Sequence, residues 1–368
     1  MDTQDILAFR GPAGYIVAIL ILLTVVLKSI PWIQLSHRRI GYLFVFLAFC
    51  SFLHTFYYIL VFYTASFTEY EARAGVFSPD LGKRITVWLA QASLFEEARL
   101  KASARSVNWW WSEQICTYAI GPWTVFLFVE GQRHQIRHLW AYMLLGQLVA
   151  VSVPANLFYL ALVLSGREFK PGTFKRGPAM PSVTTKAPPL LWISILLSLV
   201  TVANSPYTDA DTFLPNLLLM HALIVVPFLF ITSGSHGKGL SSGWFSIPYS
   251  TLHTILYAVI LTLRVKTTLA AVREGSSGLY LFQNFSFMSF CKAIIEALHS
   301  HPGQATIGWD VIWSTSSFVI WTCLDRGFSL APLSAIFASA GVVSSWVGAS
   351  AAFEKEEVKV EYTEGKDE

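Results

Sequence analysis

The residues best suited to chemistry are six polar side chains that stand inside, or at the ends of, long apolar stretches of sequence. Three are carboxylic acids, two are histidines and one is an amide: Glu113, Glu130, Asp310, His54, His221 and Asn156. An ionisable or strongly polar group is costly to bury in the apolar interior of a membrane, so each of the six is a candidate site residue.

Structural roles for the same residues stay open. The two histidines can be ordinary packing residues, and Asn156 is well suited to a hydrogen bond between helices. Asp310 stands where a helix is expected to begin, so capping of that helix explains it as well as catalysis does. Glu130 closes an apolar helix before a glycine, and Glu113 follows three tryptophans. These two acids are the least easily explained by packing.

Aromatic side chains are abundant, with 13 Trp, 14 Tyr and 27 Phe. Interfacial belts and ordinary packing account for most of them. The same rings can also line a pocket that attracts cations and offers no nucleophile to quench them. Combined with one carboxylic acid kept protonated by an apolar site, such a pocket meets the requirements of a proton-initiated carbocation cascade. The composition permits this chemistry.

Several other chemistries are excluded by motifs that the sequence lacks. It has no G-x-x-x-x-G-K-[ST] loop for ATP-driven transport, and no H-E-x-x-H or dense His/Glu cluster for a metalloprotease or an iron-dependent desaturase. The acidic pair Asp209 and Asp211 lacks the longer aspartate-rich pattern that holds magnesium and diphosphate. The four cysteines are scattered, and the net charge of +3 is too small for a nucleic-acid partner. We therefore expect no metal site.

The elements that must position these residues are membrane helices. The chain has 368 residues, 54% hydrophobic and 13% charged, about half of the ~25% charged residues of soluble domains. Apolar runs of about 20 residues each predict an all-α fold, a polytopic membrane helix bundle with about eight to nine transmembrane helices. The expected spans are residues 14–33, 41–64, 114–129, 138–165, 190–205, 213–232, 249–263, 307–324 and 330–353.

Residues 1–353 are expected to form one membrane-embedded helical domain, and its first span is expected to be a retained signal anchor. Within this domain, residues 65–112 carry most of the mid-chain charge and predict an amphipathic interfacial region. Residues 166–189 predict a solvated loop, and residues 278–298 either an interfacial segment or a further span. Residues 354–368 alternate acids and bases, which predicts a disordered polar tail.

A series of short patterns runs from residue 88 to residue 165. In chain order they are WLAQASLFE at 88–96, NWWWSEQ at 108–114, GPW at 121–123, EG at 130–131, HLWAYMLLGQ at 138–147 and NLF at 156–158. PN at 215–216, HP at 301–302 and GWD at 308–310 follow later in the chain. Together these patterns resemble the fungal integral-membrane terpene cyclases of the ascochlorin and ascofuranone pathways.

The resemblance implies an enzyme of secondary metabolism, an isomerase or lyase of terpenoid biosynthesis in the endoplasmic-reticulum membrane. Such enzymes use no metal or redox cofactor and cyclise the prenyl tail of a meroterpenoid, usually after a separate monooxygenase has epoxidised it. The implied partners are the lipid bilayer and a lipophilic, epoxyfarnesyl-type substrate. The resemblance also implies roles for the candidates, an initiating acid among the first three and groups that orient it or take the final proton among the last three: Glu113, Glu130, Asp310, Asn156, His221 and His54.

A transporter or exporter of small metabolites is the alternative from a different class. It would predict internal repeats, with broken helices in matching halves of the chain. Division of the chain at residues 166–189 reveals no recurring motif. A receptor or structural membrane protein would need a large surface outside the membrane, for which residues 65–112 are the long candidate.

Overall fold

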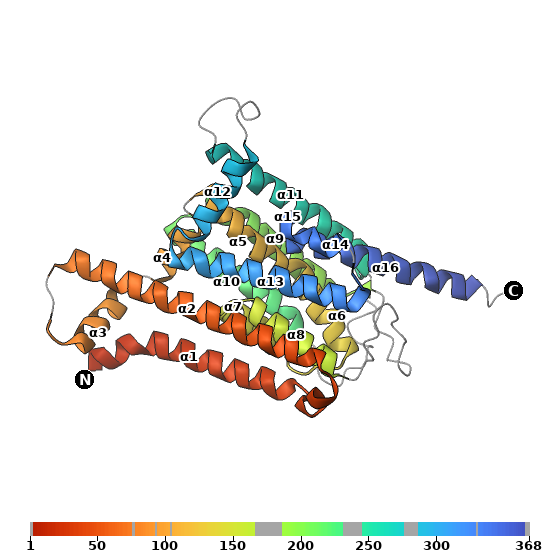
Figure 1. Cartoon of the computed structure of the whole chain (residues 1–368), viewed down its shortest axis with the longest axis horizontal. Helices are drawn as coiled ribbons and strands as arrows, with labels where there is room; N and C mark the ends of the chain where they lie inside the picture. Colours follow the sequence, from red (N-terminus) through yellow and green to blue (C-terminus); the bar gives the residue numbers. More distant parts are fainter. Residues whose placement is uncertain are drawn as a thin grey trace.

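The computed structural model describes residues 3–75, 78–92, 94–103, 105–165, 186–230, 245–275, 286–328 and 330–364. These residues are helical apart from turns and one short antiparallel pairing, of β1 (Lys186–Ala187) with β2 (Ile247–Pro248). The prediction of an all-α fold is confirmed. The helices form one bundle, from which α11 and α12 project at the top of Figure 1 and the end of α16 at the right.

In chain order the helical elements are α1 (Thr3–Ser29), η1 (Trp32–His37), α2 (Ile40–Ala74), α3 (Leu81–Gln91), α4 (Leu94–Ser103), α5 (Ser106–Tyr118), η2 (Ala119–Trp123), α6 (Thr124–Arg133), α7 (Leu139–Leu148), α8 (Ser152–Leu164), α9 (Pro189–Asn204), η3 (Ser205–Tyr207), α10 (Ala210–Leu229), α11 (Tyr249–Gly275), α12 (Phe287–Leu298), α13 (Pro302–Arg326), α14 (Leu330–Leu333), α15 (Ala335–Ala338) and α16 (Ala340–Glu364).

Four segments of the described chain are long and apolar enough to cross a membrane: Ile40–Ala74, Pro189–Tyr207, Asp211–Leu229 and Tyr249–Glu274. Large apolar side chains on these segments face outwards, with Phe46, Val200 and Leu218 each about 60% exposed. Outward-facing apolar side chains at this density suit lipid rather than water. A membrane bundle fits these observations.

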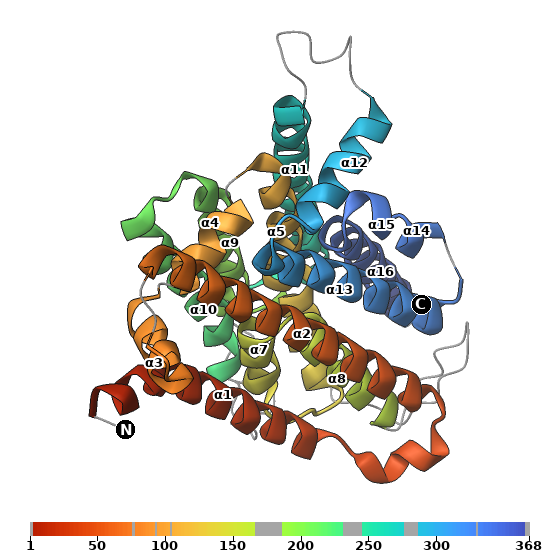
Figure 2. The same cartoon turned by 60° about the vertical axis from the view of Figure 1, so that its left-hand side comes forward.

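The centre of the bundle is α8, in which every residue from Ser152 to Leu164 is buried. It packs against α2, α7 and α13, which lie around it in both views (Figures 1 and 2). A helix that is apolar on all sides is expected in a core position rather than at a water-exposed surface. Side chains on α8 and on the faces turned towards it are therefore shielded from solvent.

One predicted helix is divided. The sequence predicts a single helix over residues 138–165, but the structure has α7 and α8 with a break at 149–151. Pro154 explains the break, because its ring has no N–H and would clash with the carbonyl of Ala150 in a continuous helix. The break leaves backbone groups on both sides without partners inside the helix.

Other boundaries also differ from the prediction. The span expected at 249–263 continues as α11 to Gly275, and the span expected at 330–353 is divided into α14, α15 and α16. The expected polar tail is helical as far as Glu364, as a continuation of α16. The region 65–112 contains the end of α2, then α3, α4 and the start of α5. Most of the expected loop at 166–189 lies outside the described residues.

The start of α13 is fixed by its own sequence. Pro302 occupies the first turn, where a missing N–H costs nothing. The ring Nδ1 of His301 accepts a hydrogen bond from the amide of Gly303, at 3.1 Å. Burial, followed by the nearby charge of Lys101, lowers the pKa of His301, which suits this acceptor role. The helix therefore begins eight residues before Asp310.

Candidate functional site

Asp310 lies inside α13 and binds the N-terminus of another helix. Its carboxylate oxygens accept hydrogen bonds from the amides of Val151, the N-cap of α8, and Ser152, its first residue, at 2.8 and 2.9 Å. The hydroxyl of Ser314, one turn later in α13, donates a further bond at 3.3 Å. The sequence suggested that Asp310 could cap the helix in which it stands. The structure shows that it caps α8 instead.

The break before α8 creates this arrangement. Pro154 ends the helical path, and the amides of Val151 and Ser152 then need an acceptor from elsewhere in the fold. Asp310 supplies it, while the hydroxyl of Tyr15 donates to the freed carbonyl of Leu148. A carboxylate at a helix N-terminus also interacts favourably with the helix dipole. A proline in one helix thus determines the surroundings of an acid in another.

Glu113 lies in α5 and forms a buried ion pair with Arg264 of α11, at 3.0 Å between Oε2 and Nη1. Both residues are at most 5% exposed. The guanidinium also donates to the carbonyl of Trp110 at 2.9 Å and lies 3.9 Å from the centre of its ring. Thr117 donates to the second carboxylate oxygen of Glu113 at 3.3 Å. Glu113 is therefore neutralised by a specific cation.

The two buried acids differ in their partners. Asp310 is 6% exposed, and within the described part of the chain it has no ion pair with Lys, Arg or His. Burial without a counter-charge favours a protonated carboxyl group, whereas amide donors favour the carboxylate. Asp310 combines both influences, which suits a group that gives up and regains a proton. Glu113 has Arg264 as its ion-pair partner.

Glu130 lies at the end of α6 and pairs with residues on its own helical face. It forms an ion pair with Arg133, and His134 Nε2 lies 3.6 Å from its carboxylate. The spacings of three and four residues place such side chains side by side on a helix. This pairing gives Glu130 a structural explanation that the sequence prediction did not consider.

His54 and His221 lie on separate helices. The ring Nδ1 of His54, in α2, accepts a hydrogen bond from the indole of Trp313 in α13 at 2.9 Å. The His54 ring also lies 4.6 Å from the ring of Trp309. In α10, His221 Nδ1 lies 2.8 Å from the carbonyl of Leu217, within its own helix. His54 thus contacts the residue just before Asp310, and His221 is engaged locally.

Asn156 lies in α8, one turn after Ser152, and is completely buried. Its amide nitrogen donates to the carbonyl of Ser152 at 2.9 Å. Its carbonyl oxygen has no hydrogen-bond partner among the described residues. The structure therefore places Asp310 and Asn156, two of the six predicted residues, along the contact between α13 and α8.

Aromatic rings continue this contact beyond Asn156. Tyr159 of α8 stacks on Trp321 of α13, with ring centres 4.8 Å apart and planes at 10°. The hydroxyls of Tyr159 and Tyr118 lie 3.3 Å apart, and Phe126 packs against both Tyr159 and Trp321. We call these four residues the aromatic wall. Aromatic faces can in general stabilise a neighbouring cation.

Space beside the wall is limited in this conformation. A crevice between α5 and α13 is too narrow for a water molecule. It is lined by Gln114, Ile115, Tyr118, Val311, Ser314, Thr315 and Ala340. Next to it, α5 passes into α6 through the π-helical turn η2, which contains Pro122. Irregular turns of this kind are frequent at functional sites.

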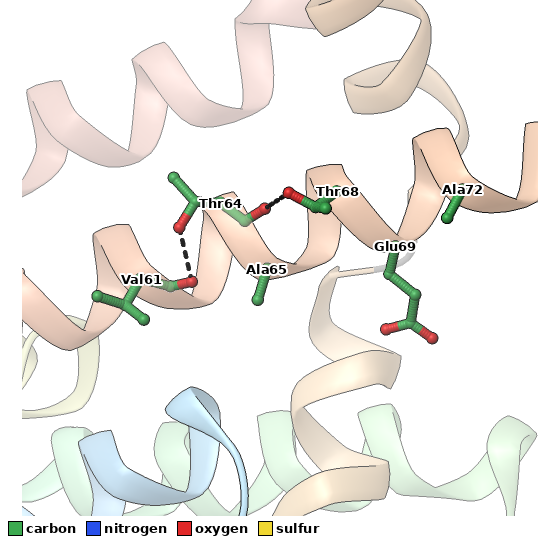
Figure 3. A pocket seen from close by; sticks show the side chains of 6 residues that line it. All are labelled: Val61, Thr64, Ala65, Thr68, Glu69 and Ala72. Atoms are coloured by element: carbon green, nitrogen blue, oxygen red, sulfur yellow. Dashed lines mark hydrogen bonds between the residues drawn. The ribbon is translucent and has the colours of Figure 1, made fainter.

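A larger hollow lies on the outer surface of α2. It has a volume of about 470 Å³ and is lined by one side of the helix around Thr64, Ala65 and Glu69, as Figure 3 shows. Thr64 is hydrogen-bonded to its own helix, and Glu69 forms an exposed ion pair with Arg73 at 3.5 Å. This open groove does not bring reactive groups together, so we do not assign chemistry to it.

Within the described ranges, no three His, Cys, Asp or Glu side chains are grouped so that they could hold a metal ion. Comparisons of the chain with protein-family models, with curated proteins and with solved structures give no match. Any function assigned to this chain therefore has to be inferred from the geometry of its own residues.

Proposed function

We propose that this chain is a membrane-bound terpene cyclase that acts on the prenyl tail of a meroterpenoid by an acid-initiated carbocation cascade. The observation that supports it best is Asp310, a buried carboxyl group without a cationic partner among the described residues, which lies on the same helix contact as the aromatic wall. An acid and π faces, without a metal, are the groups that such a cascade requires.

Asp310 would act as the general acid. In the resting state, burial favours its protonated form. After the proton passes to the epoxide oxygen or alkene of the substrate, the amides of Val151 and Ser152 stabilise the carboxylate that remains. Loss of a proton from the final cation to the protein restores the acid. The product is then an isomer of the substrate with unchanged mass.

The aromatic wall would stabilise the positive charge as the rings form. In the conformation seen here Tyr159 and Trp321 stack on each other, so a cation would meet their π faces only after the helices have moved apart. A prenyl tail needs more room than the crevice between α5 and α13 offers. The proposal therefore includes a shift of α5 against α13, with the π-helical turn η2 as the place where the backbone adjusts.

The setting of the proposed reaction is a membrane, and we propose the endoplasmic reticulum, with a multi-pass bundle of about eight to nine spans. This count adds α1, the pair α5 and α6, the pair α7 and α8, α13, and the group α14 to α16 to the four long candidates, each addition counted as one span. A lipophilic epoxyfarnesyl-type substrate would reach the site from the bilayer. A separate monooxygenase would supply the epoxide.

The test is a microsomal assay of the expressed chain with an epoxyfarnesyl phenol, analysed by mass spectrometry and NMR. The wild type should form a cyclised isomer that is absent from control membranes. Asp310→Asn should reduce turnover by about 100-fold or more, since general acid catalysis contributes roughly 10²–10⁴-fold. The control is Asp325→Asn, the same substitution later in α13 at an acid that pairs with Arg326.

Two results would contradict the assignment. Wild-type turnover by Asp310→Asn would show that Asp310 is not the acid. Loss of turnover in Glu130→Gln alone would identify Glu130, at the end of α6, as the acid. Amounts of folded protein must be matched by thermal unfolding in detergent, because Asp310 also caps α8.

A small-metabolite transporter is the second candidate, and the break between α7 and α8 favours it. Broken helices whose N-termini point into the bundle form substrate sites in many transporters. Efflux of the lipophilic precursor from proteoliposomes, without chemical conversion, would support this reading. Conversion without efflux would support the cyclase.

A further inference from the structure

The chain folds back on itself at the break between α7 and α8. The rings of Tyr142 and Phe158 lie 5.5 Å apart, centre to centre. In a continuous helix the 16 residues between them would span about 24 Å. Nearer to the break, a Cβ added at Gly146 would lie 3.2 Å from the ring of Pro154. α7 and α8 are therefore the two antiparallel arms of a hairpin, and its tip is at residues 149–151.

Both ends of this hairpin lie at the same end of the bundle. The ring of His134, shortly before α7, contacts the hydroxyl of Ser165, directly after α8. The arms have 10 and 13 residues, which corresponds to about 15 and 20 Å of helix. Neither arm is long enough to cross a hydrocarbon core of about 30 Å. The hairpin thus enters the bundle and returns to the side from which it came.

A neighbouring helix extends beyond the tip of the hairpin. The amide of Ser152 contacts Asp310, and further along Tyr159 stacks on Trp321, so α8 and α13 run parallel. Pro302, the first residue of α13, stands eight residues before Asp310, or about 12 Å of helix. The tip therefore stops about 12 Å short of the point where α13 begins. A span would have to pass that point.

The tip is stabilised inside the bundle. Irregular backbone at membrane depth is tolerated only where it is buried in protein or lines a cavity. Here the amides of Val151 and Ser152 bind Asp310, and the carbonyl of Leu148 accepts a hydrogen bond from Tyr15. The backbone groups that the turn sets free are thus paired with side chains of α13 and α1.

The segment that follows α13 has the same geometry. α13 ends at Arg326, but Ala340, at the start of α16, lies beside Ser314 and Thr315 in the middle of α13. By Val347 the chain has returned to Arg326, whose guanidinium donates to the Val347 carbonyl at 3.5 Å. The group α14 to α16 therefore enters and leaves at one side of the bundle, the side at which α8 and α13 end. We call this side the hairpin face.

Charges on the connecting segments give the hairpin face an orientation. Cytoplasmic loops carry an excess of Lys and Arg. A crossing at residues 138–165 would divide the basic residues of three short connections between the two sides of the membrane. With a hairpin there, they all belong to connections that begin and end at the hairpin face, which is then cytoplasmic: Arg38, Arg39, Arg133, Arg137, Arg167, Lys170, Lys175 and Arg176.

We propose that α7 with α8, and α14 to α16, are re-entrant hairpins that enter the membrane from the cytoplasmic side and return to it. All nine counted spans of the described chain then lie in the membrane, but seven cross it and two return. The crossing segments are α1, α2, α5 with α6, α9, α10, α11 and α13. The proposal stands apart from the cyclase assignment, because the same topology would hold for a transporter built on this fold.

The first test is cysteine accessibility in sealed microsomes, whose outer surface is cytoplasmic, with a maleimide that cannot cross membranes. The four native cysteines are replaced by alanine, and one cysteine at a time is introduced at an exposed position. Arg137→Cys, before α7, and Lys186→Cys, after α8, should both be labelled in intact vesicles. The matched control is Glu69→Cys at the opposite end of α2, whose labelling should rise several-fold only when detergent opens the vesicles.

Two results would overturn the proposal. Labelling of Arg137→Cys and Lys186→Cys from opposite sides would mean that residues 138–165 cross the membrane. If both positions need detergent and Glu69→Cys does not, the hairpin face is lumenal and the orientation is wrong.

The second hairpin is tested at its own two ends. Phe328→Cys, 81% exposed just after α13, and an epitope tag at the C-terminus should both be accessible in intact microsomes. A tag that needs detergent, with Phe328→Cys labelled without it, would show that α14 to α16 cross the membrane.

A further measurement keeps the native cysteines, so it does not depend on how the cysteine-free chain folds. An acceptor sequence for N-glycosylation is inserted either between α8 and β1 or between α2 and α3. The acceptor between α2 and α3 should be glycosylated, and the one between α8 and β1 should stay unmodified. Glycosylation between α8 and β1 would overturn the proposal, since that connection would then be lumenal.

Discussion

The buried ion pair of Glu113 with Arg264 yields the sharpest prediction about stability. Replacement of Arg264 by Met keeps the length of the side chain but leaves the carboxylate of Glu113 buried without a cation. Removal of one partner from a buried pair typically costs about 3–5 kcal/mol of unfolding free energy. Here the guanidinium also bonds to the carbonyl of Trp110 and lies over its ring at 3.9 Å. The loss should therefore fall at the upper end of that range.

The double variant separates the charge effect from the packing effect. Glu113→Gln together with Arg264→Met removes both charges and keeps similar volumes, and replacement of a whole buried pair is often close to neutral. The double variant should therefore regain most of the stability that Arg264→Met loses. The coupling between the two positions should be about 2 kcal/mol or more, as expected for groups in direct contact.

The assay is denaturant unfolding of purified protein in mixed micelles, followed by tryptophan fluorescence for the wild type, both single variants and the double variant. Additive effects would refute the reasoning, since they would mean that the two charges do not interact. Turnover of Glu113→Gln in the microsomal assay tests which of the two buried acids is the proton donor. If Glu113→Gln stays folded and loses all cyclase activity, the role of proton donor belongs to Glu113 rather than to Asp310.

Two further predictions concern packing and metals. Gly348→Ala should destabilise the protein by about 1–3 kcal/mol, because a Cβ there would lie 2.5 Å from the His253 ring, and His253→Ala should restore the loss in thermal unfolding. EDTA should leave turnover in the microsomal assay unchanged, since no metal takes part in the proposed chemistry, and inhibition that zinc or magnesium reverses would contradict the mechanism.

The sequence predicts the class of fold because apolar length is a local property. Runs of about 20 apolar residues identify α9 and α10 closely and α2 at its start, and the polar residues inside apolar stretches include both deeply buried acids, Glu113 and Asp310. The ion-pair and hydrogen-bond partners of a buried side chain are not a local property of the sequence. Arg264 lies 151 residues after Glu113, and the expected end of its span at residue 263 placed it outside the bundle.

Two local signals were present in the sequence and could have improved the prediction. Arg133 and His134 follow Glu130 at spacings of three and four residues, which indicates a pairing at the end of a helix. Pro154 stands in the middle of the expected helix at 138–165, which indicates a break. The break itself was predictable. The acceptor that completes it, Asp310, 158 residues after Ser152, was not.

The two buried acids differ because Glu113 lies where the backbone groups of its helix are already paired, whereas Asp310 contacts the unpaired end of another helix. Glu113 stands in the second half of α5, where backbone groups are paired, and its charge is balanced by a side chain of α11. Asp310 meets a helix end with unpaired amides, whose partial charges stabilise a carboxylate without neutralising it. An acid must be stable with its proton and after its loss. Among the buried acids described, Asp310 is the one that combines burial with helix-end amides in place of a cation.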